Sequence, residues 1–141
     1  MSKVAVVYWS GTGNTEAMAK AVEEGAKEAG ASVSVFTAGG FDASKLADFD
    51  AFAFGCPAMG AEELEDSEFD PMFSAVESEL SGKKIALFGS YGWGDGQWMR
   101  DWEERAKNAG ADLVTDPVMA NEAPDDAALI ACKELGAALS R

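Results

Sequence analysis

The chain has 141 residues, of which 48% are hydrophobic, and its formal net charge at pH 7 is −14. This is the length of one domain with a hydrophobic core of its own, so we expect residues 1–141 to form a single domain. The excess of acidic residues excludes ordinary nucleic-acid-binding proteins, which need clustered Lys and Arg, and an anionic membrane surface would repel the chain.

Several kinds of catalytic and metal site are excluded because the sequence contains no histidine. Ser-His-Asp triads, Cys-His pairs, histidine zinc sites and histidine-bound haem all need that residue. Cys56 and Cys132 are too few to hold a cluster through four thiolates of one chain. A disulfide scaffold is not expected at this size, and no apolar run has the length of a membrane span or the form of a signal peptide. We therefore expect reduced thiols and a cytoplasmic protein.

Apolar, β-rich runs alternate with amphipathic runs along the chain. We expect strands over 3–9, 32–37, 51–54, 84–88 and 112–119, the last interrupted by Pro117. We expect helices over 14–29, 68–80, 97–109 and 125–139, and a short helical turn capped by Asp42. This alternation predicts an α/β fold, in which an open parallel sheet carries helices on both faces. Ligands of such sheets bind beyond the carboxyl ends of the strands, which here means the loops after the first, third and fourth strands.

The loop after the first strand is Ser10-Gly11-Thr12-Gly13-Asn14-Thr15. Its glycines allow a ligand to approach the backbone, and its hydroxyls, its amide and the N-terminus of the following helix suit a phosphate. The loop lacks the Lys of a Walker A motif and the third glycine of a dinucleotide fingerprint. Taken alone it could also be an ordinary turn with Ser10 or Asn14 as the helix N-cap, so the other two loops decide its interpretation.

The loop after the third strand is Pro57-Ala58-Met59-Gly60-Ala61-Glu62. Gly60 permits a positive φ, so the Gly60–Ala61 peptide can take more than one orientation, and the polarizable Met59 suits packing on a flat ring. The acidic residues of this segment and the next are Glu62, Glu63, Glu65, Asp66, Glu68 and Asp70. We interpret this run as a solvated face in preference to a metal site, with Glu62 as an exception because it adjoins the Met-Gly turn.

The loop after the fourth strand, 89–96, alternates four glycines with Tyr91 and Trp93. A Trp between two glycines at the ligand edge of a sheet offers a planar face for stacking. Trp9 and Trp98, in contrast, are expected in the core or as a cover. One loop thus suits phosphate, while Met59 and Trp93 form opposite walls. These features predict a ligand in which a planar ring system is joined to a single phosphate.

The motifs SGTGNTE at 10–16, GCPAMG at 55–60 and GSYGWGDG at 89–96 together resemble those of short-chain flavodoxins, and the resemblance covers nearly the whole chain. It implies a flavodoxin-like three-layer sandwich with a five-stranded parallel sheet of order 2-1-3-4-5, for which flavodoxins are the standard example. It also implies FMN as a non-covalent cofactor. The family often carries a polar residue where this chain has Ala61.

The resemblance assigns roles to individual residues. Ser10, Thr12, Asn14 and Thr15 hold the FMN phosphate together with the loop amides, including those of Gly11 and Gly13. Met59 and Trp93 sandwich the isoalloxazine, and Glu62 approaches flavin N3. The Gly60–Ala61 peptide flips on reduction, and its carbonyl then accepts a hydrogen bond from N5–H and favours the neutral semiquinone. Backbone groups of Ser90, Gly92 and Gly94 line the pyrimidine side of the ring. The remaining cofactor contacts come from Pro57, Ala58 and Tyr91.

The function implied is that of a low-potential one-electron carrier that shuttles electrons between redox enzymes, without a substrate pocket of its own. Its acidic surface would steer a monomer to basic docking patches on redox partner proteins, and neither nucleic acid nor a membrane is expected as a partner. The alternative is an FMN-dependent NAD(P)H-quinone reductase on the same fold. A phospho-signalling receiver domain is set aside because Trp9-Ser10 and Gly55-Cys56 stand where that class needs acidic residues.

Overall fold

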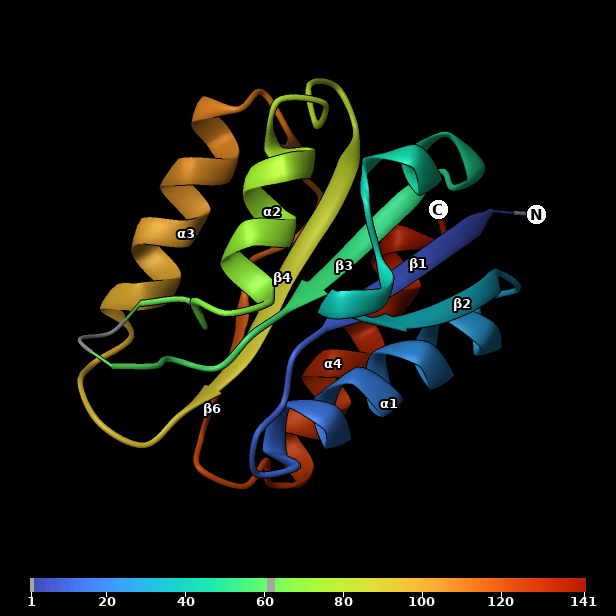
Figure 1. Cartoon of the computed structure of the whole chain (residues 1–141). Helices are drawn as coiled ribbons and strands as arrows, with labels where there is room; N and C mark the ends of the chain where they lie inside the picture. Colours follow the sequence, from blue (N-terminus) through green and yellow to red (C-terminus); the bar gives the residue numbers. More distant parts are fainter. Residues whose placement is uncertain (1, 61–62) are drawn as a thin grey trace.

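A parallel sheet with the strand order β2-β1-β3-β4-β5 runs through the molecule (Figure 1), which is described by a computed structural model covering residues 2–60 and 63–141. A further strand, β6, pairs with the end of β4. The strands are β1 (Lys3–Tyr8), β2 (Ser32–Thr37), β3 (Ala51–Gly55), β4 (Lys84–Tyr91), β5 (Asp112–Leu113) and β6 (Val118–Asn121). The predicted order of the first five strands is confirmed.

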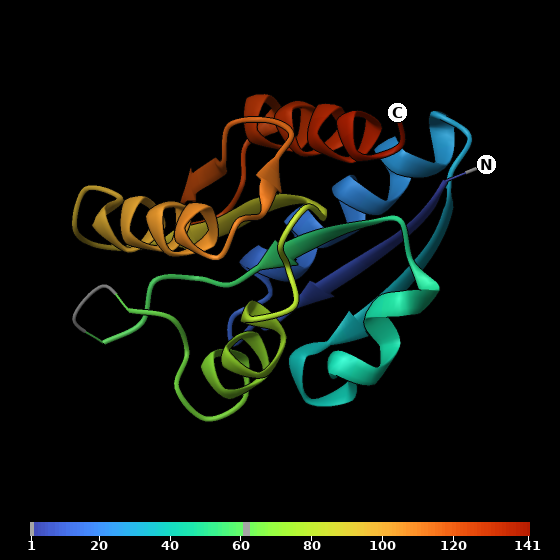
Figure 2. The same cartoon turned by 90° about the horizontal axis from the view of Figure 1, so that it is seen from above.

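Helices cover both faces of the sheet, as Figures 1 and 2 show. They are α1 (Asn14–Glu28), α2 (Phe69–Glu77), α3 (Gln97–Asn108) and α4 (Asp126–Leu139), with short 3₁₀ turns η1 (Ala38–Gly40) and η2 (Ala43–Asp48). The buried side chains of α1 and α4 share one core cluster, and those of α2 and α3 share the other with the 3₁₀ turns. The predicted three-layer sandwich is therefore confirmed.

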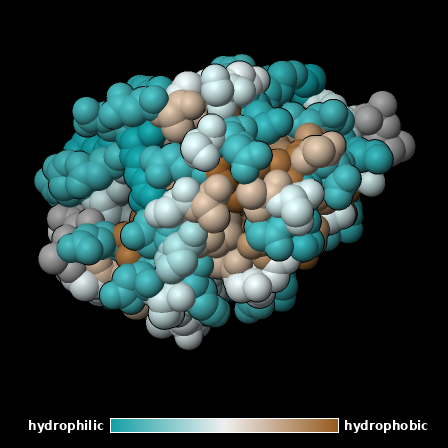
Figure 3. Space-filling model, turned by 45° about the horizontal axis from the view of Figure 1, so that its top comes forward, coloured by the Kyte–Doolittle hydropathy of each residue, from teal (hydrophilic) through white to brown (hydrophobic). Residues whose placement is uncertain are grey.

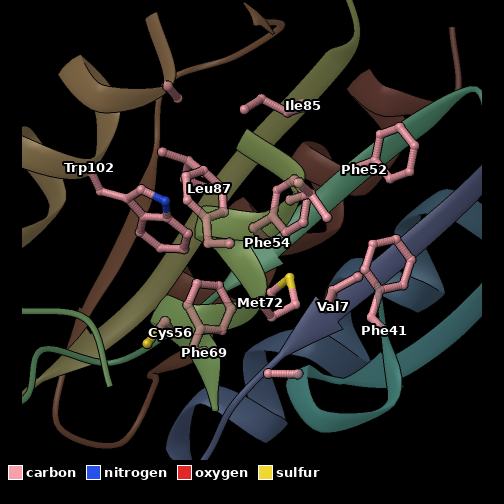
Figure 4. Close-up of a cluster of buried hydrophobic side chains, with 14 of the residues drawn as sticks. Val7, Phe41, Phe52, Phe54, Cys56, Phe69, Met72, Ile85, Leu87 and Trp102 are labelled. Carbon is pink, nitrogen blue, oxygen red and sulfur yellow. The ribbon is translucent and has the colours of Figure 1, made fainter. Parts of the chain in front are cut away.

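The two faces of the sheet differ in the size of their side chains. Toward α2 and α3, the sheet presents large residues, among them Phe52 and Phe54, which share a cluster with Phe69 and Trp102 of those helices (Figure 4). The ring of Phe54 also contacts that of Phe73 in α2. Toward α1 and α4, strands β3 and β4 present the small side chains of Ala51, Ala53 and Ala86 together with one large ring, that of Phe88. The central strands are buried on both faces, as their unbroken apolar runs predict.

Glycines allow α1 and α4 to pack closely against each other. A Cβ atom at Gly25 would lie 2.0 Å from the carbonyl oxygen of Lys133, and one at Gly136 would lie 2.1 Å from the carbonyl oxygen of Val22. No side chain fits at either position without moving a helix backbone. The close contact lies in the C-terminal half of α1, and it holds this half of the helix against α4.

The structure corrects three of the predicted boundaries. Strand β4 continues beyond 88 to Tyr91, because residues 88–91 pair with β6. The expected fifth strand is divided into β5 and β6 around Pro117, at the predicted interruption. Helix α2 ends at Glu77 and not at 80, since the Glu79 and Leu80 amides bond to the carbonyls three residues earlier and tighten the chain into turns.

Most of the surface visible in Figure 3 is hydrophilic, and apolar residues reach it in a limited band. Among residues 2–60 and 63–141, no helix combines the length and the hydrophobicity that crossing a membrane requires. Both cysteines are buried and free, and burial raises the pKa of Cys56 and of Cys132 to about 12. Their thiols are therefore protonated and unreactive at neutral pH.

Candidate cofactor site

A cavity of about 330 Å³ opens where β1, β3 and β4 end. Three segments far apart in the sequence supply its wall, together with one residue that follows β6. The lining residues are Trp9, Gly11, Thr12, Asn14, Pro57, Ala58, Met59, Ser90, Tyr91, Gly92, Trp93 and Glu122. The loops predicted after the first, third and fourth strands therefore meet at one site.

The 10–15 loop leads into α1 through a glycine. Gly13 is the N-cap residue of α1, with a φ of 95°, and it provides no side-chain acceptor for the first amides of the helix. Its own N–H donates to the Ser10 hydroxyl at 3.1 Å. The alternative interpretation of this loop, an ordinary turn with Ser10 or Asn14 as the N-cap, is therefore wrong about the N-cap. An N-terminus without a side-chain cap leaves backbone donors and the positive end of the helix dipole for an anion.

The space in front of Gly13 is open, because a Cβ placed there would meet no atom within 4 Å. Ser10 and Gly13 line a second cavity of about 530 Å³, which shares Trp9, Gly11 and Thr12 with the first cavity. The loop therefore borders two cavities, and Gly11 and Thr12 are exposed.

Thr15, predicted at the phosphate, is buried, and its hydroxyl lies 3.1 Å from the hydroxyl of Ser90. The bond joins the first turn of α1 to the end of β4, so Thr15 fixes the loop that precedes α1 to this strand. It does not line the cavity.

The loop after β3 forms a narrow hairpin. The backbones of Met59 and Glu63 exchange two hydrogen bonds of 2.8 Å each, so 56–60 forms an outgoing arm that pairs with a returning arm, 63–65. Gly60 has a φ of 54°, and a Cβ there would meet nothing within 4 Å. The predicted roles of Ala61 and Glu62 fall on residues outside those that the structure describes. Met59 is half-buried on the cavity wall.

Trp93 stands out in the loop after β4 because its side chain is 51% exposed. Gly92 beside it has open space where a Cβ would be, and Gly94, at a φ of 78°, lies next to the cavity without lining it. A large planar ring held at the edge of an apolar cavity is available for stacking. Trp98, in contrast, is 1% exposed and donates its indole N–H to the Cys56 carbonyl at 3.2 Å, as expected of a core residue.

Two lining residues were missed in the sequence. Trp9, expected in the core or as a cover, forms part of the wall, and a Cβ at Gly11 would lie 3.0 Å from its ring. Glu122 has a φ of 58°, in the left-handed region, and its N–H donates to the Tyr91 carbonyl at 2.7 Å. Glu122 was missed because the pairing of β6 with the end of β4 leaves no local signal in the sequence.

The acidic run is a solvated face only in part. Glu63, Asp66 and Glu68 are exposed, as expected, and Asp70 pairs with Arg105 at 2.8 Å. Glu65 is 5% exposed, so that part of the interpretation is wrong. Within the described ranges, no group of three or more acidic or cysteine side chains is arranged to hold a metal ion.

The family model described as "Flavodoxin" matches residues 6–136. The chain belongs to the flavodoxin family. It is 48% identical to a flavodoxin from Megasphaera elsdenii over 138 residues, which are 98% of each chain. It is 48% identical to a flavodoxin from Clostridium beijerinckii over 122 residues, 86% of this chain and 88% of that one. The solution structure of the two-electron reduced M. elsdenii flavodoxin superposes with a TM-score of 0.89 and covers 97% of this chain and 98% of that one.

Flavodoxins are small FMN-binding electron carriers, so the expectation of an electron-transfer protein is confirmed and the quinone reductase is not favoured. The residues present fit FMN. The open cradle at Gly13 at the start of α1 suits a phosphate, and Met59 and Trp93 on the cavity wall suit a flat ring.

Proposed function

We propose that residues 1–141 form one FMN-binding domain and that the chain is a low-potential one-electron carrier between redox enzymes. The observation that carries the proposal is the 51% exposed Trp93, which stands on the wall of the same cavity as the loop leading into α1. One end of that cavity suits an anion and the other suits a planar ring. FMN, when bound, supplies the one-electron chemistry.

The phosphate of FMN is proposed to bind at the loop 10–15. The hydroxyls of Ser10 and Thr12, the Asn14 side chain and the Gly11 amide offer donors. The Gly13 amide donates to Ser10, and Gly13 contributes the open space in front of the helix, while Thr15 holds the loop through Ser90. The N-terminus of α1 adds its dipole, so the phosphate charge is met without a lysine.

The ring of FMN is proposed to lie between Met59 and Trp93. These side chains orient the ring and exclude water from its faces. Gly60, at a φ of 54°, gives the backbone the freedom to turn the Gly60–Ala61 peptide toward the ring, with Glu62 near flavin N3. The remaining proposed contacts come from Pro57, Ala58, Tyr91 and the backbone groups of Ser90, Gly92 and Gly94.

The low potential is proposed to come from charge. Glu122 lines the cavity, and the whole chain carries a net charge of −14. Negative charges around a confined site oppose the arrival of a further negative charge on the ring, and so they lower its reduction potential. The same charge is proposed to steer the monomer, in the cytoplasm, to basic docking patches of redox partner proteins.

Fluorescence titration of apoprotein with FMN tests the proposal. The Trp93→Ala variant is expected to raise the dissociation constant at least about tenfold, since it removes much of one apolar wall. Trp93→Phe keeps a stacking face and is the matched control, with a smaller loss expected. Reductive titration of the loaded wild type should show two separate one-electron steps. A wild-type apoprotein that takes up no FMN would contradict the proposal, as would equal affinities of Trp93→Ala and wild type.

A further inference from the structure

The hairpin that carries Met59 and Gly60 is anchored differently on its two arms. The outgoing arm is tied to β4, because the Cys56 amide donates to the Phe88 carbonyl at 3.1 Å and the Ala58 amide donates to the Ser90 carbonyl at 3.0 Å. The returning arm, 63–65, bonds to the outgoing arm at Met59, packs Leu64 against the core and ends at Glu65. Leu64 and Glu65 therefore share the task of fixing this arm relative to the sheet.

Glu65 joins the returning arm both to the base of the hairpin and to α2. Its N–H donates to the Cys56 sulfur at 3.4 Å, so the two ends of segment 56–65 meet. Cys56 and Phe69 belong to the same buried cluster (Figure 4). The Glu65 carbonyl also accepts from the Asp70 amide at 2.8 Å. Glu65 thus links the hairpin to the first turn of α2.

Both oxygens of the Glu65 carboxylate are engaged. Oε2 accepts from the Ser67 amide at 2.8 Å and from the Ser67 hydroxyl, and Oε1 accepts from the amides of Glu68 at 2.8 Å and Phe69 at 2.9 Å. These amides lie at the start of α2, where the helix dipole also favours a negative charge. A 5% exposed carboxylate in this position is a side-chain anchor that replaces the missing cap at Glu68.

We propose that Glu65 is a positioning residue of the FMN site. Because Glu65 fixes the returning arm to α2, it also fixes the pair of backbone hydrogen bonds between Met59 and Glu63. It thereby sets where Met59 and Gly60 lie relative to the cofactor ring. It touches no cofactor itself. The inference rests on the proposed function, because its consequence is a change in how the bound ring is held.

The test compares Glu65→Gln with Glu68→Gln. Both variants remove one negative charge at the start of α2, but Glu68 is exposed, and its amide, not its side chain, takes part in the anchor. Amide hydrogen exchange is measured on the apoproteins, and FMN affinity and the two one-electron potentials are measured on the loaded proteins. Glu65→Gln is expected to speed exchange at Met59 and Glu63 about tenfold beyond any change in global opening, and to weaken FMN binding about tenfold. It is also expected to change the separation between the two potentials. Glu68→Gln is expected to leave exchange at Met59 and Glu63 within about twofold of wild type. Because Glu68 borders the second cavity at loop 10–15, loss of its charge should strengthen and not weaken the binding of a phosphate there.

Four outcomes would overturn the inference. Equal shifts of the potentials in the two variants would show an effect of charge alone. A second contrary outcome is that Glu65→Gln lowers only the global stability, while its exchange rates at Met59 and Glu63 and its two potentials equal those of Glu68→Gln. Glu65 would then have a purely structural role. If Glu65→Gln does not fold, Ser67→Ala removes one bond to the carboxylate, and wild-type exchange at Met59 in that variant would equally contradict the proposal. If the wild type binds FMN and is reduced in two one-electron steps, and Glu65→Gln has the same affinity, exchange rates and potentials, this inference is refuted while the proposed function stands.

Discussion

The hydroxyls of Thr15 and Ser90 lie 3.1 Å apart in a buried hydrogen bond, although 75 positions separate the two residues in the chain. Thr15 belongs to the first turn of α1 and Ser90 to the end of β4. The bond therefore ties the proposed phosphate loop to the strand that leads to Trp93. Removing either hydroxyl leaves the other one buried without a hydrogen-bond partner, which costs about 1–3 kcal/mol of folding free energy.

A double-mutant cycle in the apoprotein should measure this dependence. Thr15→Val and Ser90→Ala are each expected to lower the free energy of unfolding by about 1–2 kcal/mol, since each leaves the other hydroxyl unpaired. The double variant should lose less than the sum, by at least about 0.5 kcal/mol, because it leaves neither hydroxyl unpaired. Urea unfolding followed by circular dichroism is the measurement. Strictly additive losses would show that the two hydroxyls do not interact.

Gly13 and Gly30 offer a matched pair at the two ends of α1. Their φ angles are 95° and 96°, and a Cβ at either position would meet nothing within 4 Å. Gly13→Ala and Gly30→Ala should therefore cost similar stability, about 1–2 kcal/mol each, from backbone strain alone. We expect only Gly13→Ala to weaken FMN binding as well, because only Gly13 belongs to the proposed phosphate loop. The comparison requires unfolding curves of both apoproteins and their FMN titrations. Equal losses of FMN affinity would argue against a phosphate at this loop.

The strand order and the three site loops could be predicted because their signals are local or are carried by motifs. The unbroken apolar run 4–7 predicts a strand covered on both faces, and the glycines and hydroxyls of 10–15 follow it directly. The exposed Trp93 and the buried Trp98 could also be told apart. Trp93 lies between glycines in a loop, whereas Trp98 lies on the apolar face of a helix.

What could not be predicted depends on contacts between distant segments. The extension of β4 to Tyr91 and the position of Glu122 at the cavity both follow from the pairing of β6 with β4, which no local pattern shows. Glu65 stands in a run of exposed acidic residues and differs from them only because the chain folds back over the start of α2. Trp9 packs against the core, as expected, but its place on the cavity wall was missed because that place depends on how the loop at Gly11 turns.

Glu122 is held in a strained backbone conformation at the cavity. Because its φ is 58°, replacement by glycine should stabilise the apoprotein by about 1 kcal/mol. Glu122→Gln keeps the strain and removes the charge, so its stability should stay near that of wild type. Both variants should raise the flavin potentials, since each removes a negative charge from the cavity wall. Thermal unfolding and potentiometric titration separate the two effects. Unchanged potentials in both variants would show that the Glu122 charge does not act on the ring.

The pH dependence of stability provides a test of the Glu65 carboxylate. Burial of this carboxyl opposes its ionisation, but hydrogen bonds from the Ser67 hydroxyl and from the amides of Phe69, Glu68 and Ser67 outweigh the burial and lower the pKa of Glu65. A group whose pKa is lower in the folded state stabilises the fold above its unfolded pKa, about 4.3 for Glu, and loses this contribution as the pH falls through the folded value.

The free energy of unfolding of wild-type apoprotein should therefore exceed that of Glu65→Gln by about 2 kcal/mol at pH 7. The difference should shrink as the pH falls below about 4, where the wild-type carboxyl takes up its proton. The pKa of Asp42 is also lowered in the folded state, by its bonds with Ser44, but this residue is the same in both proteins and cancels from the difference. Urea unfolding of both proteins at a series of pH values between 3 and 7 measures this difference in unfolding free energy. A difference that stays constant over this range would mean that the ionised form of Glu65 is not what holds the start of α2.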